Sequence, residues 1–167
     1  MRGREPSRGA APFLRSESST GLRRDPGSAI LVGPQSGKGD TGMDVRLKDV
    51  RAVREIIDLY VKGSAGDAQL LRSIFHPDAL MTGYFDGQLG IGSPEPFFAE
   101  VANLEEAGSA ESYAGEIESI EVVGDVATAR LVETGFLGSD FVDFFHLIRV
   151  EGEWKIISKT YHQQVQP

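Results

Sequence analysis

From Asp44 onward, apolar residues return every three or four positions along the chain. This spacing brings them onto one side of an α-helix, so the pattern predicts an amphipathic helix of about five turns that buries a single stripe. Gly63 and Gly66 mark its end. The stripe consists of Leu47, Val50, Val53, Ile57 and Tyr60.

A second helix, two strands and a third helix are expected next. We place the second helix after residue 66, the strands over residues 79–84 and 89–91, and the third helix after residue 92. Residues that cap or break elements give these boundaries. They are Asp67 and His76-Pro77 for the second helix, Asp86-Gly87 for the turn between the strands, and Ser93-Pro94-Glu95 for the third helix.

Between residues 113 and 162, apolar and polar residues alternate with a period of two. Turn signals at Gly124-Asp125, Gly138-Ser139 and Glu151-Gly152 divide this segment into four consecutive antiparallel strands. Helices followed by a sheet are typical of an α+β domain. We therefore expect a curved antiparallel sheet that wraps around the N-terminal helices.

The last hairpin predicts which side chains share a face of this sheet. With an uninterrupted ladder from the Glu151-Gly152 turn, Asp143 lies opposite Thr160 and beside His162. Polar groups and apolar side chains on one inner face are typical of a small-molecule pocket. The ligand-binding residues predicted on this hairpin are Phe141, Phe145, Trp154, Ser158 and Thr160.

The preceding strand adds to this face. A turn at Gly138-Ser139 pairs Thr134 with Asp143 and brings Arg130 onto the inner face as well. Tyr84 ends the first predicted strand, near the expected mouth of the pocket, and is the last predicted ligand contact.

Asp143 and His162 form the candidate catalytic pair. A carboxylate orients a neighbouring imidazole and raises its pKa, and such a pair exchanges protons near neutral pH. The alternative is a hydrogen-bonded polar pair at the cavity edge, because structural ion pairs also perturb pKa values.

The opposite face of the sheet is rich in apolar residues that no helix covers. Monomers seldom expose such patches, so we expect a homodimer that forms through this outer face. The predicted contact residues are Leu131, Phe144, His146, Ile148, Ile157 and Tyr161.

Composition narrows the classes of partner and cofactor. The chain of 167 residues has a net charge of −8, and residues 44–167 are more acidic still because residues 1–43 are basic. Such a surface repels phosphate backbones and anionic lipids, so we expect neither nucleic-acid nor membrane binding. The chain has no cysteine, and its three histidines lack metal-ligand spacing, so we expect no metal or cofactor and a cytoplasmic protein.

Residues 1–43 are rich in Gly, Pro and Ser and have no periodic apolar face. Such a composition cannot repay the entropy of ordering, so we predict a disordered N-terminal segment followed by one domain over residues 44–167. An organellar transit peptide, or a true start at Met43, are the alternatives for this segment.

The order of these elements, together with four short strings, resembles the nuclear transport factor 2 superfamily, and most closely its SnoaL-like proteins labelled putative lumazine-binding. The resemblance covers about residues 45–163. It implies a cone-shaped α+β fold with a cavity between sheet and helices, commonly assembled as a homodimer. The strings are Gly66-Asp67, Phe75-His76-Pro77-Asp78-Ala79, Gly152-Glu153-Trp154-Lys155-Ile156 and Tyr161-His162.

Ketosteroid isomerases share this fold, but their catalytic residues are not matched here. An ungapped alignment from Gly66-Asp67 puts Gly83 where the resemblance implies the general base and Leu59 where it implies the tyrosine that binds the oxyanion. Tyr60 is one residue away, and one residue rotates a side chain about 100° around a helix. The isomerase mechanism therefore does not carry over.

Three hypotheses for function follow. The first is a domain that binds a small, apolar, cyclic ligand. The second is a cyclase, isomerase or dehydratase that uses Asp143 and His162 to move a proton at a carbon next to a carbonyl. The third is a homodimeric protein-interaction module with a filled cavity. A cavity carboxylate with a raised pKa would favour the second hypothesis over the first.

Overall fold

A computed structural model describes residues 39–107 and 113–164 of the chain. The disorder predicted for residues 1–43 mostly concerns residues outside this described part. Residues 39–43 are an exception, because they already belong to the first helix.

Three helices form where the apolar spacing predicts them: α1 spans Gly39–Ser64, α2 spans Ala68–Ile74 and α3 spans Glu95–Ala107. The carboxylate of Asp67 accepts a hydrogen bond of 2.8 Å from the backbone N–H of Leu70, which caps α2 as expected. Along α1, the predicted stripe is most deeply buried in the second half of the helix, at Val53, Ile57 and Tyr60.

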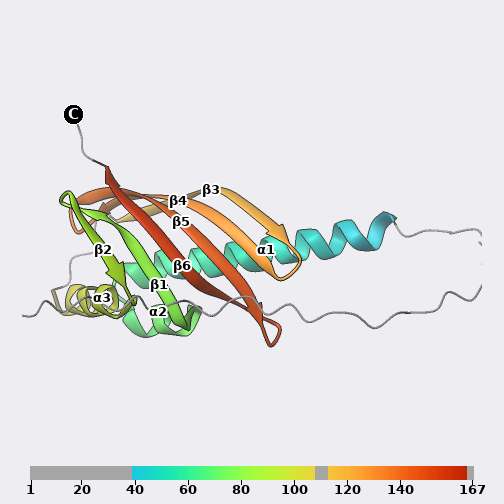
Figure 1. Ribbon diagram of the computed structural model, residues 1–167, viewed down its shortest axis with the longest axis horizontal. Coiled ribbons are helices and arrows are strands. Elements are labelled where there is room, and N and C mark those ends of the chain that lie inside the picture. Colours follow the sequence, from blue (N-terminus) through green and yellow to red (C-terminus); the bar gives the residue numbers. More distant parts are fainter. Residues whose placement is uncertain (1–38, 108–112, 165–167) are drawn as a thin grey trace, which may run out of the picture. The chain divides into compact units, whose positions relative to one another are not determined.

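Six strands form one open, curved sheet in the order β2-β1-β6-β5-β4-β3 (Figure 1). All neighbouring strands are antiparallel except β1 and β6, which run parallel. The predicted α+β class and the curved, mainly antiparallel sheet are confirmed. The strands are β1 (Phe75–Phe85), β2 (Gln88–Gly92), β3 (Ala114–Val123), β4 (Val126–Phe136), β5 (Ser139–Val150) and β6 (Glu153–Gln164).

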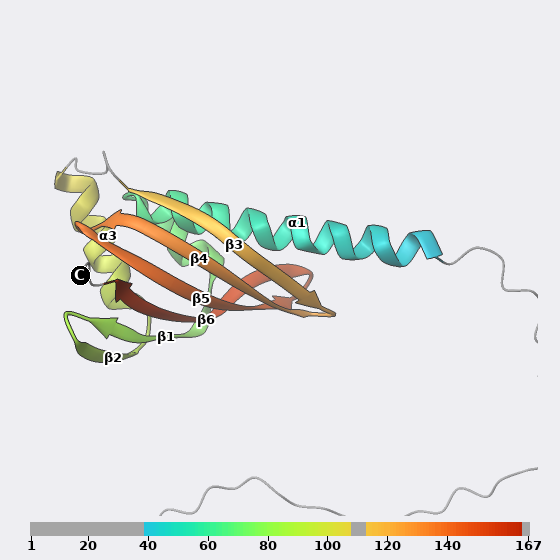
Figure 2. The same cartoon turned by 90° about the horizontal axis from the view of Figure 1, so that it is seen from above.

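Within the described residues, helices α1, α2 and α3 leave one face of the sheet uncovered. Helix α1 runs along one side of strands β3 to β6, and α3 lies across one end of the sheet (Figure 2). The core lies between these layers and includes Ile57, Leu71, Phe98, Leu147 and Ile156. Burying a side chain of this size stabilises the fold by about 1.5–3 kcal/mol.

A β-bulge in β6 changes the register that the sequence predicts. From the turn at Glu151-Gly152, the predicted pairing holds as far as Leu147 and Ile156. Ile157 then has no partner, and His146 pairs with Ser158. A single extra residue moves every later side chain of one strand to the other face.

The expected neighbours of Asp143 are therefore wrong. Asp143 pairs with Tyr161, and His162 pairs with Val142 on the outer face. The bulge brings Lys159 and Tyr161 inward. It moves Ser158, Thr160 and His162, which were expected inside, to the outer face.

A second bulge, in β4, reverses the faces that the sequence predicts for the side chains of this strand. The turn to β5 forms at Leu137 and Gly138, both with positive φ, one residue earlier than predicted. Gly135, with φ of 77°, adds an extra residue, and its N–H donates to the Asp140 carboxylate at 3.0 Å. Arg130 and Thr134 consequently lie outside, whereas Leu131 and Glu133 are buried.

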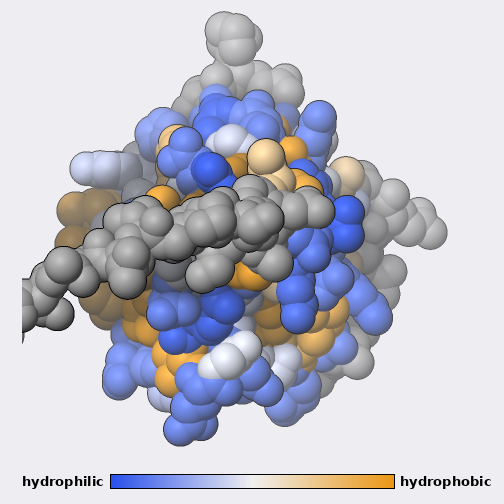
Figure 3. Space-filling model, turned by 90° about the vertical axis from the view of Figure 1, so that its right-hand side faces the viewer, coloured by the Kyte–Doolittle hydropathy of each residue, from blue (hydrophilic) through white to orange (hydrophobic). Residues whose placement is uncertain are grey.

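The outer face is partly as predicted. Phe144, His146, Ile148 and Ile157 do lie on it, but Leu131 and Tyr161 do not. One end of the molecule carries mostly hydrophilic residues, with hydrophobic residues in separate patches between them (Figure 3). Of the helices in the described residues, none is both long and apolar enough to cross a membrane.

Candidate functional site

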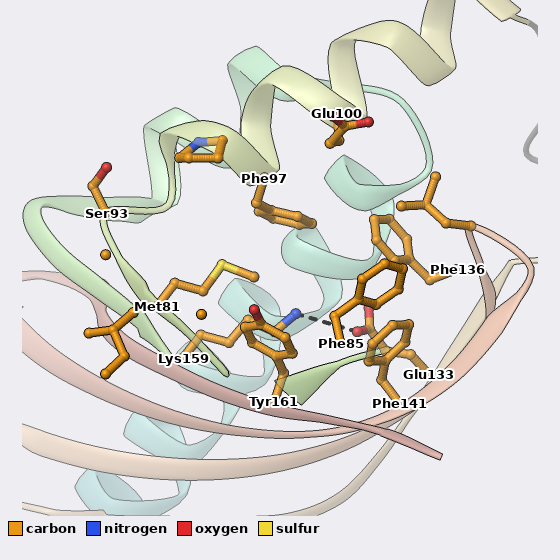
Figure 4. Close-up of a pocket in the computed structure, with 15 residues that line it drawn as sticks. Met81, Phe85, Ser93, Phe97, Glu100, Glu133, Phe136, Phe141, Lys159 and Tyr161 are labelled. Atoms are coloured by element: carbon orange, nitrogen blue, oxygen red, sulfur yellow. Dashed lines mark hydrogen bonds and ion pairs between the residues drawn. The ribbon is translucent and has the colours of Figure 1, made fainter. Parts of the chain in front are cut away.

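A cavity of about 640 Å³ lies between the inner face of the sheet and helix α3. Strand β1 and the β2 strand beside it form one wall, and the β4–β5 hairpin forms another (Figure 4). Ile91 and Glu100 are exposed and mark the mouth of the cavity. This volume is within the range of small-molecule sites.

Five of the residues that line the cavity are aromatic, and three of them pack against one another: Phe85, Phe136 and Phe141. The rings of Phe85 and Phe141 stack with 12° between their planes, and Phe136 packs edge-on against Phe141. Phe97 of α3 covers the cavity from the helix side (Figure 4). Such a wall favours a flat, apolar ligand, because aromatic rings pack well against planar molecules.

The floor of the cavity is charged. Lys159 and Glu133 both line the cavity, and their side chains lie 3.5 Å apart between Nζ and Oε2 (Figure 4). The Lys159 ammonium also lies 2.6 Å from Oδ2 of Asp143, which is fully buried beneath it. Two carboxyl groups thus share one ammonium inside the protein.

Two tyrosines complete this buried cluster. Tyr60 accepts a hydrogen bond from Lys159 and donates to Asp143 at 3.4 Å, and Tyr113 donates to Glu133 at 2.5 Å. Burial and the negative charge of Glu133 raise the pKa of both tyrosines, so both remain protonated donors. Tyr60 points into the interior, as predicted for a residue of the buried stripe of α1.

The charges of the cluster follow from its pKa shifts. Burial raises the pKa of Asp143 well above its usual value. The positive charge of Lys159 opposes this rise, and the negative charge of Glu133 adds to it. Burial alone would raise the pKa of Glu133, but Lys159 and hydrogen bonds from Asp143 and Tyr113 hold it below its usual value. Burial alone would lower the pKa of Lys159, but both carboxyls raise this pKa above its usual value. The two carboxyls around the ammonium thus have pKa values shifted in opposite directions, and Glu133 is the one that loses its proton first.

Aromatic faces surround the Lys159 ammonium as well. Its Nζ lies 4.8 Å from the ring centre of Tyr60, 5.1 Å from that of Phe97 and 5.6 Å from that of Tyr161. Each such cation–π contact contributes about 0.5–2 kcal/mol, more where water is excluded. These rings help to keep the ammonium charged without bulk water.

The residues predicted for the site divide between cavity, core and surface. Phe141 lines the cavity, whereas Phe145 is fully buried beneath it. Trp154 is buried at the end of the hairpin, where the Arg149 guanidinium lies over its ring, 4.7 Å from the ring centre. Tyr84 is exposed beside His162. The outward residues are Tyr84, Arg130, Thr134, Ser158, Thr160 and His162.

The sequence pattern does not predict Glu133, Lys159 and Tyr161 as residues of the site. A signal for Glu133 exists, because Ala127, Ala129 and Leu131 form an apolar period-two run that ends at Glu133. Lys159 gives no such signal, since a single lysine in a strand is normally solvent-exposed and its acidic partners are far away in the sequence.

Chemically, the site offers a carboxylate base and a cation at the bottom of an apolar cavity. The carboxylate can take a proton from a bound molecule, and the ammonium can stabilise the negative charge that results. A desolvated cavity strengthens both effects.

Comparison with known proteins agrees with this architecture. Residues 48–162 match the family described as putative lumazine-binding. Aldolase FrzH from a Cladobotryum species is 28% identical over 97 residues, which are 58% of this chain and 76% of that protein.

Solved structures give the same result. An NTF2-like protein of unknown function from Silicibacter pomeroyi is 30% identical, with a TM-score of 0.64 over 71% of this chain and 98% of that one. Another from Shewanella baltica is 28% identical, with a TM-score of 0.62 over 72% and 97% of the two chains. The resemblance inferred from short sequence strings is confirmed.

Proposed function

Because the chain belongs to the putative lumazine-binding family, we propose that its cavity binds a small, mostly apolar, cyclic molecule that carries a carbonyl group. The observation that carries this proposal is the Lys159–Glu133 pair on the floor of an otherwise mostly apolar cavity. Buried ion pairs contribute little net stability, since desolvation offsets their attraction. A charged pair at the bottom of an apolar cavity is therefore better explained by a polar group on a ligand.

Lumazine itself is a suitable first probe, since it is a fluorescent, flat, bicyclic molecule with carbonyl groups. Titration of lumazine with the full chain is expected to give saturable binding. Lys159→Met should weaken this binding at least tenfold, whereas Lys155→Met, at a half-buried lysine away from the cavity, should not change it. No saturable binding of lumazine, together with no co-purified small molecule in native mass spectrometry, would overturn the proposal.

The second candidate function is catalysis of proton transfer at a carbon next to a carbonyl. The observation that favours it is the similarity to aldolase FrzH. The carboxylate that lines the cavity, Glu133, has a lowered pKa and therefore adds no support of its own. In this scheme the Glu133 carboxylate takes the carbon-bound proton, and the Lys159 ammonium stabilises the enolate oxygen. Asp143 lies behind Lys159 and influences the charges of the Lys159–Glu133 pair. His162 has no place in this mechanism, since it lies on the outer face.

Hydrogen exchange tests this candidate directly. Acetylnaphthalene in heavy water should lose the proton NMR signal of its acetyl methyl group faster with the full chain present. Glu133→Gln should abolish the acceleration, because the amide cannot accept the proton. An equal exchange rate with and without the protein would exclude the enzymatic candidate and leave the binding function.

The proposal extends to assembly and location. Phe144, His146, Ile148 and Ile157 lie on the face of the sheet that helices α1, α2 and α3 leave uncovered, which supports a homodimer through this face. The lack of cysteine supports a cytoplasmic location.

A further inference from the structure

The side chain of Tyr161 lies across two neighbouring strands. Tyr161 belongs to β6, and Gly83 of β1 is its parallel partner. A Cβ atom at Gly83 would stand 2.1 Å from the Tyr161 carbonyl oxygen and 2.6 Å from Cγ of its ring. The ring therefore occupies the space that any other residue at position 83 would fill.

The second glycine continues this path. Gly90 of β2 pairs with Gly83, and a Cβ atom at Gly90 would stand 3.0 Å from the Tyr161 hydroxyl. The two paired glycines thus form a shallow notch that we call the glycine notch. The ring of Phe141 packs edge-on against Tyr161 from the other side, at 6.4 Å between ring centres. The glycine notch and Phe141 together fix the Tyr161 ring in one orientation.

The hydroxyl of Tyr161 faces the cavity (Figure 4). The hydroxyls of Tyr60 and Tyr113 donate to Asp143 and Glu133, but that of Tyr161 makes no hydrogen bond within residues 39–107 and 113–164. The Lys159 ammonium already has three acceptors, in Tyr60, Asp143 and Glu133. Lys159 therefore acts on a ligand through its positive charge, and among these groups Tyr161 is the one with a hydrogen-bond donor left for a ligand.

From this geometry we infer that Tyr161 is a specificity-determining residue, which donates a hydrogen bond to the carbonyl oxygen of the bound molecule while the glycine notch fixes its ring. The inference rests on the proposed function of the cavity. In this inference, the Tyr161 hydroxyl is the group that selects carbonyl compounds over hydrocarbons of the same shape. A tyrosine held in this way loses little conformational freedom on binding, so its hydrogen bond contributes to affinity with little offsetting cost.

The test compares two probes that differ in one atom group. Acetylnaphthalene has a carbonyl oxygen, whereas isopropenylnaphthalene, substituted at the same ring carbon, has a methylene group in its place. Dissociation constants of both probes are measured by calorimetry with the full chain, with Tyr161→Phe, and with Tyr84→Phe as the matched control. Tyr84 is the residue next to Gly83, and its side chain is exposed outside the cavity.

The wild-type chain should bind acetylnaphthalene more tightly than isopropenylnaphthalene. Tyr161→Phe should weaken acetylnaphthalene binding about 3- to 10-fold, as for the loss of one hydrogen bond, and leave isopropenylnaphthalene binding unchanged. Tyr84→Phe should change neither. These results would support the inference.

Two results would overturn it, and they differ from each other. If both probes bind and Tyr161→Phe changes their affinities equally or not at all, the role of Tyr161 is refuted and the cavity remains a binding site. If neither probe binds the wild-type chain, the inference falls together with the proposed binding of carbonyl compounds.

Discussion

Nζ of Lys159 lies 2.6 Å from Oδ2 of Asp143, although both side chains are almost completely excluded from solvent. Lys159 is 3% exposed and Asp143 is 0% exposed. A single ammonium inside a protein is costly unless acceptors surround it, and here Glu133 and Tyr60 supply the remaining ones. This buried cluster is the main feature that distinguishes the cavity floor from an ordinary apolar core.

Removing the ammonium should destabilise the protein strongly. Lys159→Met leaves Asp143 and Glu133 buried without their cation, and breaking a buried pair in this way costs about 3–5 kcal/mol of unfolding free energy. Urea denaturation at neutral pH measures the change. Lys155→Met is the control, since Lys155 pairs with Glu153 near the surface and should lose less than about 1 kcal/mol. Equal stability of the two variants would contradict the role assigned to the buried cluster.

The raised pKa of Asp143 predicts a particular pH dependence. A carboxyl whose pKa is higher in the folded state favours folding most at low pH, and this contribution falls as the pH rises above the unfolded value of about 3.9. Asp143→Asn removes the effect. Compared with wild type, the variant should therefore gain stability between about pH 4 and pH 8.

Thermal denaturation across this pH range provides the measurement. Asp58→Asn, at an exposed position of α1, serves as the control and should follow the wild-type curve. Parallel curves for Asp143→Asn and the wild type would show that the pKa of Asp143 is not raised in the folded protein.

The glycine notch should tolerate no side chain at its centre. Gly83→Ala places a methyl group against the Tyr161 backbone and ring, so β1 and β6 must separate at a cost of about 1–3 kcal/mol. Gly92→Ala, in the same hairpin with open space around its Cβ position, is the control. Chemical denaturation of both variants tests the prediction, which fails if they are equally stable.

The proposed homodimer predicts a surface variant that dissociates it. Phe144 is 48% exposed on the outer face, and Phe144→Glu would bring two like charges together across a twofold interface. Light scattering should give the mass of a dimer for wild type and of a monomer for Phe144→Glu. Leu89→Glu, at a 53% exposed position on the edge strand β2, should stay dimeric. A monomeric wild-type protein at micromolar concentration would refute the dimer.

The sequence predicts the elements of this fold well because their signals are local. The apolar spacing of α1, the Asp67 cap and the turn at Glu151-Gly152 each depend on residues within a few positions of one another. On β5, the prediction that Asp143 faces inward and Phe144 outward is likewise correct.

The candidate site is harder to predict, because it depends on two single-residue bulges. The extra residues at Gly135 and Ile157 reverse the faces of the strand segments that carry Glu133, Lys159 and His162. The bulge at Gly135 is stabilised by a hydrogen bond from its N–H to the Asp140 side chain, and an alternation pattern carries no information on such contacts. The burial of Lys159 depends in the same way on carboxyls from two other strands.

A crystal structure of the full chain soaked with acetylnaphthalene tests the central claim most directly. We expect the naphthalene rings to lie between Phe97 and Phe141, with the carbonyl oxygen within hydrogen-bond distance of the Tyr161 hydroxyl. A cavity that stays empty at saturating probe, or is filled by protein side chains, would contradict the account.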